Sequence, residues 1–474
     1  MRLLLFLIKG EKGMQNMFGR KIITSDAEHI TDENILDELN SALTEHLRNR
    51  SQIDYLWRYY RGDQPILQRV KKVRPEICNR IVENRANEIV SFKVGYLCGE
   101  PIQYVGRTSG EEVSQGISDL NEMMLSENKA TQDKEIVEWQ MICGTAYRLV
   151  LPRRRLGEDS APFEIYTLDP RDTFVVYSSD IDNHPLFAVK YRSTQLYGDI
   201  YSVYSSRHYW KICNNEIAES LEHGLGLVPV FEYPANRARL GSFEIVLPLL
   251  DAMNNIESNR LDGLEQTVQA FIKFINCDVT AEDFERLKDL GAIKVKSSDG
   301  AEADVDIVSN ELNQSQSQTL KEDCYNAVLT ICGIPNRNGG SSTSDTGAAV
   351  LLRDGWSLAE ARAKDSELMF KRSEKDMLRL ILRIIRDTPG LSQAVYQLRL
   401  GDIGMQFTRR NYENIQSKSQ VLIAMLQNEK IHPRLAFEHC GMFSDPEDAY
   451  NLSFRYYESL QKQPSQSEPE FINV

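Results

Sequence analysis

The chain has 474 residues, of which 41% are hydrophobic and 26% charged, and its 55 basic and 69 acidic side chains leave a formal charge of −14 at pH 7. This composition is typical of a folded protein, and the length suits about three folding units. Tight binding to DNA or to an anionic membrane surface draws on clustered positive charge. The overall charge therefore excludes both, while transient contact with a polyanion remains compatible with it.

The N-terminus begins with one short apolar run, Leu3–Ile8. A membrane-spanning helix needs about 20 apolar residues and a signal peptide about 7–15, so we expect neither a membrane partner nor a secretion signal. Met14 and Met17 offer alternative translation starts. Eight cysteines are scattered without a C-x-x-C pair, which predicts buried thiols rather than a zinc ribbon or a redox site.

The first 145 residues read mainly as helices. Apolar residues recur at helical spacing from Thr31 to Tyr60, again over about 79–96, and from Glu112 to Gly144. A polar, basic connector separates the first two helices, and Pro101–Val105 has the pattern of a short strand.

From Ala146 to about Val230 the period changes to two, with turn residues such as Asp169-Pro170 between the runs. This pattern predicts an antiparallel meander set among helices, and hence the α+β fold class.

The second half is dominated by long helical patterns. They cover about 243–275, 311–333 and 348–387, and Gly355 is expected to bend the last one. Between the first two lies a compact acidic segment, 278–306, with nine acidic and four basic side chains; a short helix at 282–290 and a strand at 292–296 are expected in it. The segment 335–347 is rich in Gly, Ser and Asn, a flexible composition. Two shorter helices are expected at 417–427 and 433–440.

Motifs for catalysis and cofactor binding are missing from the sequence. There is no P-loop, the pair Gly224-x-Gly226 does not open a helix, and no zinc-protease, nucleophile-elbow or EF-hand pattern occurs. His432 and His439 form a weak candidate metal pair, and the acidic residues of 299–306 are better explained as a solvated loop. We therefore expect no catalytic residue, metal or cofactor.

Three basic segments are candidates for contact with a polyanion or a neighbouring subunit. They are Arg153–Arg155, the connector residues of 69–74, and the C-terminal half of the long helix at 371–386. A solvated hairpin tip is the favoured interpretation of the first, a solvated loop fits the second equally well, and a solvated or interface face is favoured for the third.

Several short stretches resemble, in the same order, those of the portal proteins of tailed bacteriophages, the head-to-tail connectors. The matching stretches are Tyr59–Leu67, Asn79–Asn84, Val94–Ile102, Cys143–Tyr147, Leu168–Arg171, Val228–Tyr233, Thr346–Leu352 and Phe443–Glu447. Each is weakly specific alone, but the ordered series spans about residues 55–450. Cys98 and Gln103 depart from the pattern, and the run Leu3–Ile8 has no counterpart in it.

The resemblance implies a portal architecture, with an α/β wing, a long-helix stem, a small α/β clip and a helical crown. The implied parts are a leader at 1–20, the wing at 21–242, stem helices at 243–276 and 308–334 flanking the clip at 277–307, a channel loop at 335–347, a long helix at 348–387 joining wing and crown, and the crown with its tail at 388–474.

The resemblance also implies a non-enzymatic role. The chain is expected to form a ring, usually of twelve copies, at one capsid vertex, in the host cytoplasm during assembly and in the virion afterwards. Its implied partners are double-stranded DNA, the terminase large subunit that hydrolyses ATP, major capsid and scaffolding proteins, and head-tail adaptor proteins.

The resemblance assigns two groups of site residues. Those expected to touch DNA in the channel loop are Arg337, Asn338, Gly339, Gly340, Ser341 and Ser342. Those expected to dock terminase or adaptors on the clip are Asp283, Glu285, Lys288, Asp289, Lys294 and Lys296. The alternative hypothesis is a phage-associated intracellular enzyme acting on nucleic acid or peptide bonds through a site without a recognised motif.

Overall fold

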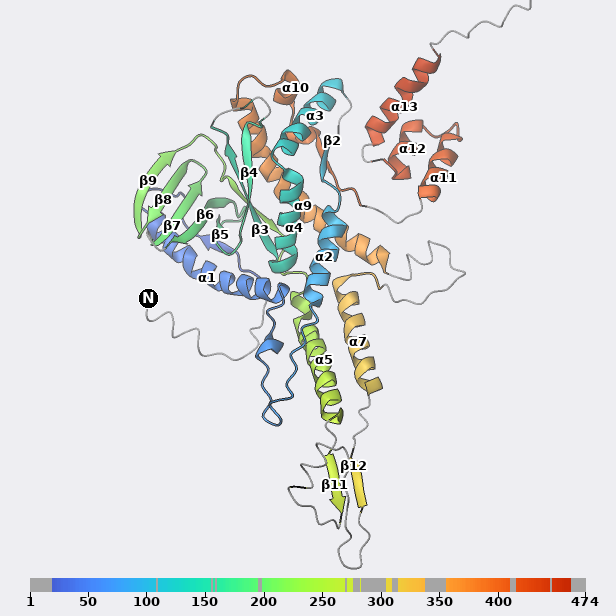
Figure 1. The fold of residues 1–474 in the computed structure, drawn as a ribbon. Helices are drawn as coiled ribbons and strands as arrows, with labels where there is room; N and C mark the ends of the chain where they lie inside the picture. The colour runs from blue at the N-terminus through green and yellow to red at the C-terminus, as the bar shows by residue number, and fades with distance from the viewer. Residues whose placement is uncertain are drawn as a thin grey trace, which may run out of the picture. The chain divides into compact units, whose positions relative to one another are not determined.

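The fold is that of a computed structural model (Figure 1). It describes residues 19–107, 110–154, 157, 160–194, 198–268, 271–275, 282, 304–308, 314–336, 355–409, 415–443 and 446–461. Helices and sheets are both present, so the expected α+β class is confirmed, while the boundaries of wing, stem, clip and crown stay a prediction. The chain divides into two compact units, one of residues 1–57, 87–245 and 333–474, and a second of 58–86 and 246–332.

The first unit contains a six-stranded sheet in the order β1-β5-β6-β7-β8-β9. Its strands are β1 (Ile23–Ser25), β5 (Thr173–Ser178), β6 (Pro185–Thr194), β7 (Gly198–Ser205), β8 (His208–Cys213) and β9 (Glu216–Glu222). Strands β5 to β8 form the antiparallel meander that the alternating pattern predicts, and β9 extends it. The two strands predicted before Thr173 do not belong to this meander, because they lie in a separate three-stranded sheet. β1 joins parallel to β5, and neither β1 nor the polar edge strand β9 has a sequence signal strong enough to predict.

Helix α1 (Ile35–Tyr60) packs its apolar side on this sheet. Ile35 and Leu39 are buried together with Phe174, Phe187 and Trp210. The apolar residues of α1, spaced by three and four, thus pack against the alternate apolar residues of the strands and form one core with them.

A second sheet has three strands in the order β10-β3-β4. They are β3 (Thr145–Pro152), β4 (Phe163–Leu168) and β10 (Val230–Pro234). Gly144 closes helix α4 (Lys129–Cys143) in a left-handed conformation, and a Cβ there would lie 2.1 Å from the carbonyl oxygen of Arg239. Glycine is therefore required at this turn between helix and strand.

The helix expected over 112–144 is two helices. Helix α3 (Glu111–Ser126) ends before Asn128, which has a φ of 53°, and α4 follows. The break arises because this left-handed residue cannot continue an α-helix.

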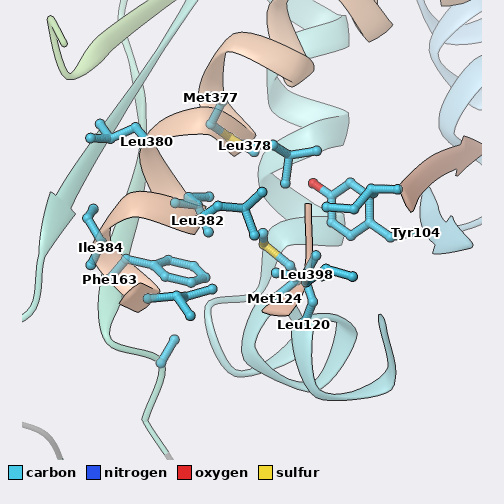
Figure 2. Close-up of a cluster of buried hydrophobic side chains, with 14 of the residues drawn as sticks. Tyr104, Leu120, Met124, Phe163, Met377, Leu378, Leu380, Leu382, Ile384 and Leu398 are labelled. Atoms are coloured by element: carbon cyan, nitrogen blue, oxygen red, sulfur yellow. The ribbon is translucent and has the colours of Figure 1, made fainter. Parts of the chain in front are cut away.

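The 32-residue helix α9 (Trp356–Asp387) contributes many side chains to an apolar core of the unit. Figure 2 shows Met377, Leu378 and Leu382 of α9 among Leu120 of α3 and Phe163 of β4. Each such fully buried side chain contributes about 1.5–3 kcal/mol. Gly355 is the N-cap of α9 and has a φ of 84°. Residues 348–354 of the expected helix lie outside the described residues, so the bend expected at Gly355 stays a prediction.

The C-terminal part of the unit begins with helix α10 (Gln393–Gln397) and strand β13 (Ile403–Gln406), which pairs antiparallel with β2 (Gln103–Gly106). Helices α11 (Ile415–Leu426), α12 (Pro433–Cys440) and α13 (Pro446–Gln461) follow. The strand expected at 101–105 and the helices expected at 417–427 and 433–440 are thus confirmed.

In the second unit, helices α5 (Leu247–Val268) and α7 (Gln314–Cys332) pack on each other. The helix expected over 243–275 ends at Val268, and Phe271–Ile275 forms β11, paired with β12 (Asp304–Val308). The aromatic and β-branched run from Phe271 to Ile275 favours a strand, although its spacing also fits a helix. The helix and strand expected at 282–290 and 292–296 lie outside the described residues, apart from Glu282.

Helix α2 (Arg85–Cys98) starts six residues later than expected. The residues before it run irregularly, interrupted by the short 3₁₀ helix η1 (Pro65–Gln68), because side chains of α5 bind their backbone. No helix among the described residues is long and apolar enough to span a membrane.

Candidate functional site

One face of α5 carries four polar side chains, Asp251, Asn254, Ser258 and Asp262. We call these four residues the α5 ladder. Their spacing of three, four and four residues places them in one row along the helix. Asn254 and Ser258 are completely buried and Asp262 is 2% exposed. At the first position the hydroxyl of Tyr59 donates to the Asp251 carboxylate at 2.9 Å.

The two middle positions bind the backbone that leads into α2. The N–H of Glu83 donates to Oδ1 of Asn254 at 2.8 Å, and the N–H of Ile81 donates to Oγ of Ser258 at 3.0 Å. The amide of Asn254 also donates to the side-chain oxygen of Gln64 at 2.5 Å. The ladder therefore supplies the partners that buried backbone groups outside helices and sheets require.

Asp262 binds two cations of the basic connector. Its carboxylate lies 2.7 Å from Nζ of Lys71 and 3.0 Å from the guanidinium of Arg69, and it accepts the N–H and the side-chain amide of Asn79. Although desolvation opposes its ionisation, the hydrogen bonds from Lys71 and Asn79 and the charge of Lys71 hold the pKa of Asp262 below its usual range. The carboxylate is thus charged at neutral pH, and two cations of the connector are bound within the unit.

Helix α7 contacts the opposite side of α5 and the entry to α2. Lys321 of α7 binds Glu257 of α5 and lies 3.3 Å from Glu83. The guanidinium of Arg85 stacks 4.2 Å above the ring of Tyr325. These ion pairs and the cation–π contact fix α7 beside α5.

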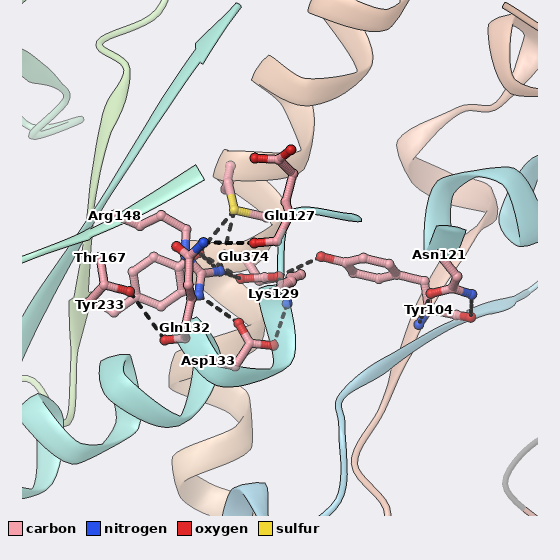
Figure 3. A network of polar contacts seen from close by, with 11 residues as sticks. Tyr104, Asn121, Glu127, Lys129, Gln132, Asp133, Arg148, Thr167, Tyr233 and Glu374 are labelled. Carbon is pink, nitrogen blue, oxygen red and sulfur yellow. Dashed lines mark hydrogen bonds and ion pairs between the residues drawn. The ribbon is translucent and has the colours of Figure 1, made fainter. Parts of the chain in front are cut away.

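In the first unit, four charged side chains form a closed, buried cluster (Figure 3). This buried quartet consists of Lys129, Asp133, Arg148 and Glu374, each at most 4% exposed in its side chain. The two cations alternate with the two carboxylates at distances of 2.5 to 3.2 Å, so the cluster has no net charge.

Two tyrosines complete the hydrogen bonding of the Glu374 carboxylate. Tyr104 and Tyr233 each donate to its carboxylate at 2.6 Å. Desolvation would raise the pKa of Glu374, but the charges of Lys129 and Arg148 and the hydrogen bonds from Lys129 and Tyr104 hold it well below its usual range. A carboxylate that stays charged and is closed off from solvent is suited to positioning α9, not to proton transfer with a substrate.

The candidate metal ligands show no assembled site. No group of three or more His, Cys, Asp or Glu suited to a metal occurs within the part of the chain that the structure describes. His432 caps α12, where its Nδ1 accepts the N–H of Arg434 at 3.2 Å. The seven described cysteines are free thiols, three of them buried.

Comparison with known proteins identifies the family of the chain. The family profile described as "Phage portal protein, SPP1 Gp6-like" matches residues 39–467. The chain belongs to the phage portal protein family. No curated protein matches the chain.

Portal proteins are structural components of bacteriophage particles, with roles in capsid assembly and DNA packaging. Two of the stretches that resemble the family, Tyr59–Leu67 and Asn79–Asn84, supply partners of the α5 ladder, including Tyr59, Gln64 and Asn79. The fold thus gives these portal stretches a physical role, which is to hold an irregular backbone against α5.

Neither group of assigned site residues can be located in this portal protein. The channel-loop residues Arg337 to Ser342 lie outside the described residues, and so do the clip residues Asp283, Glu285, Lys288, Asp289, Lys294 and Lys296. Their roles therefore stay predictions.

The three basic segments differ in how strongly their charges are bound. In the first segment the guanidinium of Arg153 is bound, 2.5 Å from Glu127 and 3.2 Å from Glu164, whereas Arg154 is exposed as expected of a hairpin tip. Arg155 lies outside the described residues. Arg69 and Lys71 are bound by Asp262. On α9, Lys371 pairs with Glu367, Arg379 pairs with Asp376, and Arg386 donates to a backbone carbonyl.

Neither the ladder nor the buried quartet was predicted from the sequence. For the ladder a signal existed in the sequence. The regular apolar spacing of α5 is interrupted near Arg260, and Asn254 and Ser258 stand at helical spacing within a long helix. For the quartet the signal was Arg148, a lone charge inside the apolar run from Ala146 to Leu151. Its partners Asp133 and Glu374 lie in helices and look like ordinary surface charges in the sequence.

Proposed function

We propose that this portal protein closes into a ring of identical copies at one vertex of the phage capsid and that double-stranded DNA enters and leaves through the ring. The observation that carries the proposal is the family match over residues 39–467. The resemblance implies twelve copies.

The charge of the chain suits a conduit. A protein that lets DNA slide must avoid strong static contacts with phosphates, and a formal charge of −14 opposes such contacts. Two cations of the connector are moreover bound to Asp262, so they are not offered to DNA. In this proposal Arg337 and Asn338 of the channel loop make the transient contacts.

We further propose that the clip, with Asp283, Glu285, Lys288, Asp289, Lys294 and Lys296, docks the terminase large subunit and later the head-tail adaptor proteins. The acidic excess of 278–306 favours a partner surface of opposite charge. The terminase hydrolyses ATP, which fits the missing P-loop, and we infer that the portal chain itself is not an enzyme. Major capsid and scaffolding proteins are the partners at the vertex, during assembly in the host cytoplasm and then in the virion.

Microscopy and mass measurement test this function directly. The purified chain, alone or with capsid and scaffolding proteins, is imaged by negative stain and weighed by native mass spectrometry. Annular particles with a central hole and a mass that is a whole multiple of 54.3 kDa are expected. Compact monomers with metal-dependent nuclease or peptidase activity would instead support the enzyme hypothesis.

A further inference from the structure

The connector of the second unit, residues 69–74, has an apolar tip that consists of Val70, Lys72 and Val73. Val70 and Val73 are 80% and 79% exposed, and Lys72 between them is exposed as well. The tip is nevertheless held in place, because Arg69 and Lys71 on either side of Val70 both bind Asp262. An exposed apolar surface on an anchored segment loses little further conformational freedom on binding, which favours a docking role.

Helix α7 also carries exposed apolar side chains. We call Leu320, Asp323 and Ile331 the α7 stripe. Leu320 and Ile331 are 54% and 40% exposed and lie eleven residues apart, which is about three turns and hence the same side of the helix. Asp323 is exposed between them. The neighbouring cation, Lys321, is bound to Glu257 and Glu83 on the other side of α7, so it does not cover this stripe.

The two surfaces of one copy lie on different sides of α5. The tip is anchored to the ladder face through Asp262, whereas α7 contacts α5 through Glu257 and through Arg260, which donates to Gln318. Figure 1 shows the connector and α7 on opposite sides of α5. A copy of the chain therefore cannot bring its own tip to its own stripe.

We propose that the tip docks on the α7 stripe of a neighbouring copy, with Val70 and Val73 against Leu320 and Ile331, and Lys72 beside Asp323. Each surface combines apolar side chains with one charge, and the two charges are opposite, which is the complementarity that selects a partner and its register. Such a contact joins two different surfaces, so it is heterologous, which is the kind of interface that a closed ring repeats from copy to copy. The inference rests on the proposed ring and names one of its interfaces.

Charge reversal tests the contact in the full-length protein. Lys72→Glu and Asp323→Lys should each raise about tenfold the protein concentration needed for half-maximal ring assembly, because each places like charges together. The double variant K72E/D323K should restore most of the assembly, since the pair is re-formed in reverse. Glu322→Lys is the matched control, because it makes the same charge change on α7 about 100° round the helix from Asp323 and should assemble like the wild type.

Native mass spectrometry and negative-stain images give the ring fraction, and circular dichroism checks that each variant is folded. Rings from both single variants at wild-type concentrations, or a double variant no better than the worse single one, would overturn the interface while leaving the portal function intact. A wild type that forms no ring would instead refute the proposed function. Normal rings from K72E that package DNA poorly would mean that the tip contacts DNA and not a second copy.

Discussion

Glu374 lies fully buried in the middle of α9 and contacts both cations of the buried quartet and two tyrosine hydroxyls. Its replacement by glutamine leaves Lys129 and Arg148 facing a single carboxylate, that of Asp133, and so leaves one buried positive charge uncompensated. We expect Glu374→Gln to lower the free energy of unfolding by about 3–5 kcal/mol. Urea denaturation followed by circular dichroism measures the change.

The exposed pair of Arg379 and Asp376 on the same helix provides the control. Solvent screens such a pair, so Arg379→Ala should cost at most about 1 kcal/mol. If Glu374→Gln and Arg379→Ala lowered the free energy of unfolding by the same amount, the quartet would contribute no more to stability than a surface ion pair.

His46 of α1 is 2% exposed, stacks on Phe174 and binds the carbonyl oxygen of Arg171 at 3.1 Å. Desolvation is the main cause that lowers its pKa from 6.5 to about 4. The imidazole of the unfolded chain therefore binds a proton at a higher pH than the buried imidazole of the folded chain. The contribution of neutral His46 to the free energy of unfolding is complete above pH 6.5 and is lost as the pH falls towards 4. The difference corresponds to about 3 kcal/mol.

We therefore expect His46→Gln, which keeps a hydrogen-bond donor, to flatten the fall of the thermal midpoint between pH 6.5 and 4.5. Glu374 acts in a lower window, since a carboxyl with a depressed pKa loses its contribution only as the pH falls below its unfolded value of about 4.5. Thermal scans at several pH values separate the two groups. An unchanged slope above pH 4.5 in the His46 variant would contradict the assignment.

At the scale of elements, α5 holds the connector by one row of side chains. Replacing Asp262 by Asn removes the charge that binds Arg69 and Lys71, while the shape of the side chain is kept. We expect Asp262→Asn to free the connector and to raise the rate of tryptic cleavage after these residues about tenfold, because proteolysis follows local opening. Mass spectrometry of timed digests gives the cleavage rate and the sites.

Asn255→Ala is the matched control for this experiment, since Asn255 is exposed on α5 and bonds only to the carbonyl oxygen of Asp251 among the contacts described here. Its digest should equal that of the wild type. If Asp262→Asn digests no faster than Asn255→Ala, the connector is held by the backbone contacts to Asn254 and Ser258 alone.

Much of the element order could be predicted because the local patterns are strong. The meander of 173–213 alternates clearly, and the apolar spacing of α1 and α9 is regular over many turns. The pattern failed where tertiary contacts decide the conformation. Residues 79–84 have helical spacing, yet Asn254 and Ser258 draw their N–H groups away from a helix. Phe271–Ile275 fits both periods, and pairing with β12 decides for the strand.

The candidate site was less accessible to prediction than the fold. A carboxylate such as Asp262 gains its role only when the chain returns some 190 residues later to a basic connector, and no local rule encodes that return. Family resemblance pointed instead to the channel loop and the clip, whose residues lie outside the described structure.

At the scale of the whole molecule, the channel loop provides the sharpest functional prediction. A variant in which residues 337–342 are deleted should form rings with the normal number of copies, because none of the α5 ladder, the connector tip or the α7 stripe is touched. It should package or retain little DNA, which a nuclease-protection assay in assembled particles measures. Normal packaging by this variant would remove the loop from the mechanism, and failed ring assembly would give it a structural role.

The α5 ladder has a mechanical consequence. Residues 79–83 run along α5 and are joined to it at three successive positions, Asn254, Ser258 and Asp262, so a pull along the axis of α5 strains all three junctions at once. Such shear loading resists rupture better than peeling, in which the junctions would give way one after another. The second unit is thus built as a strut that withstands load along its length.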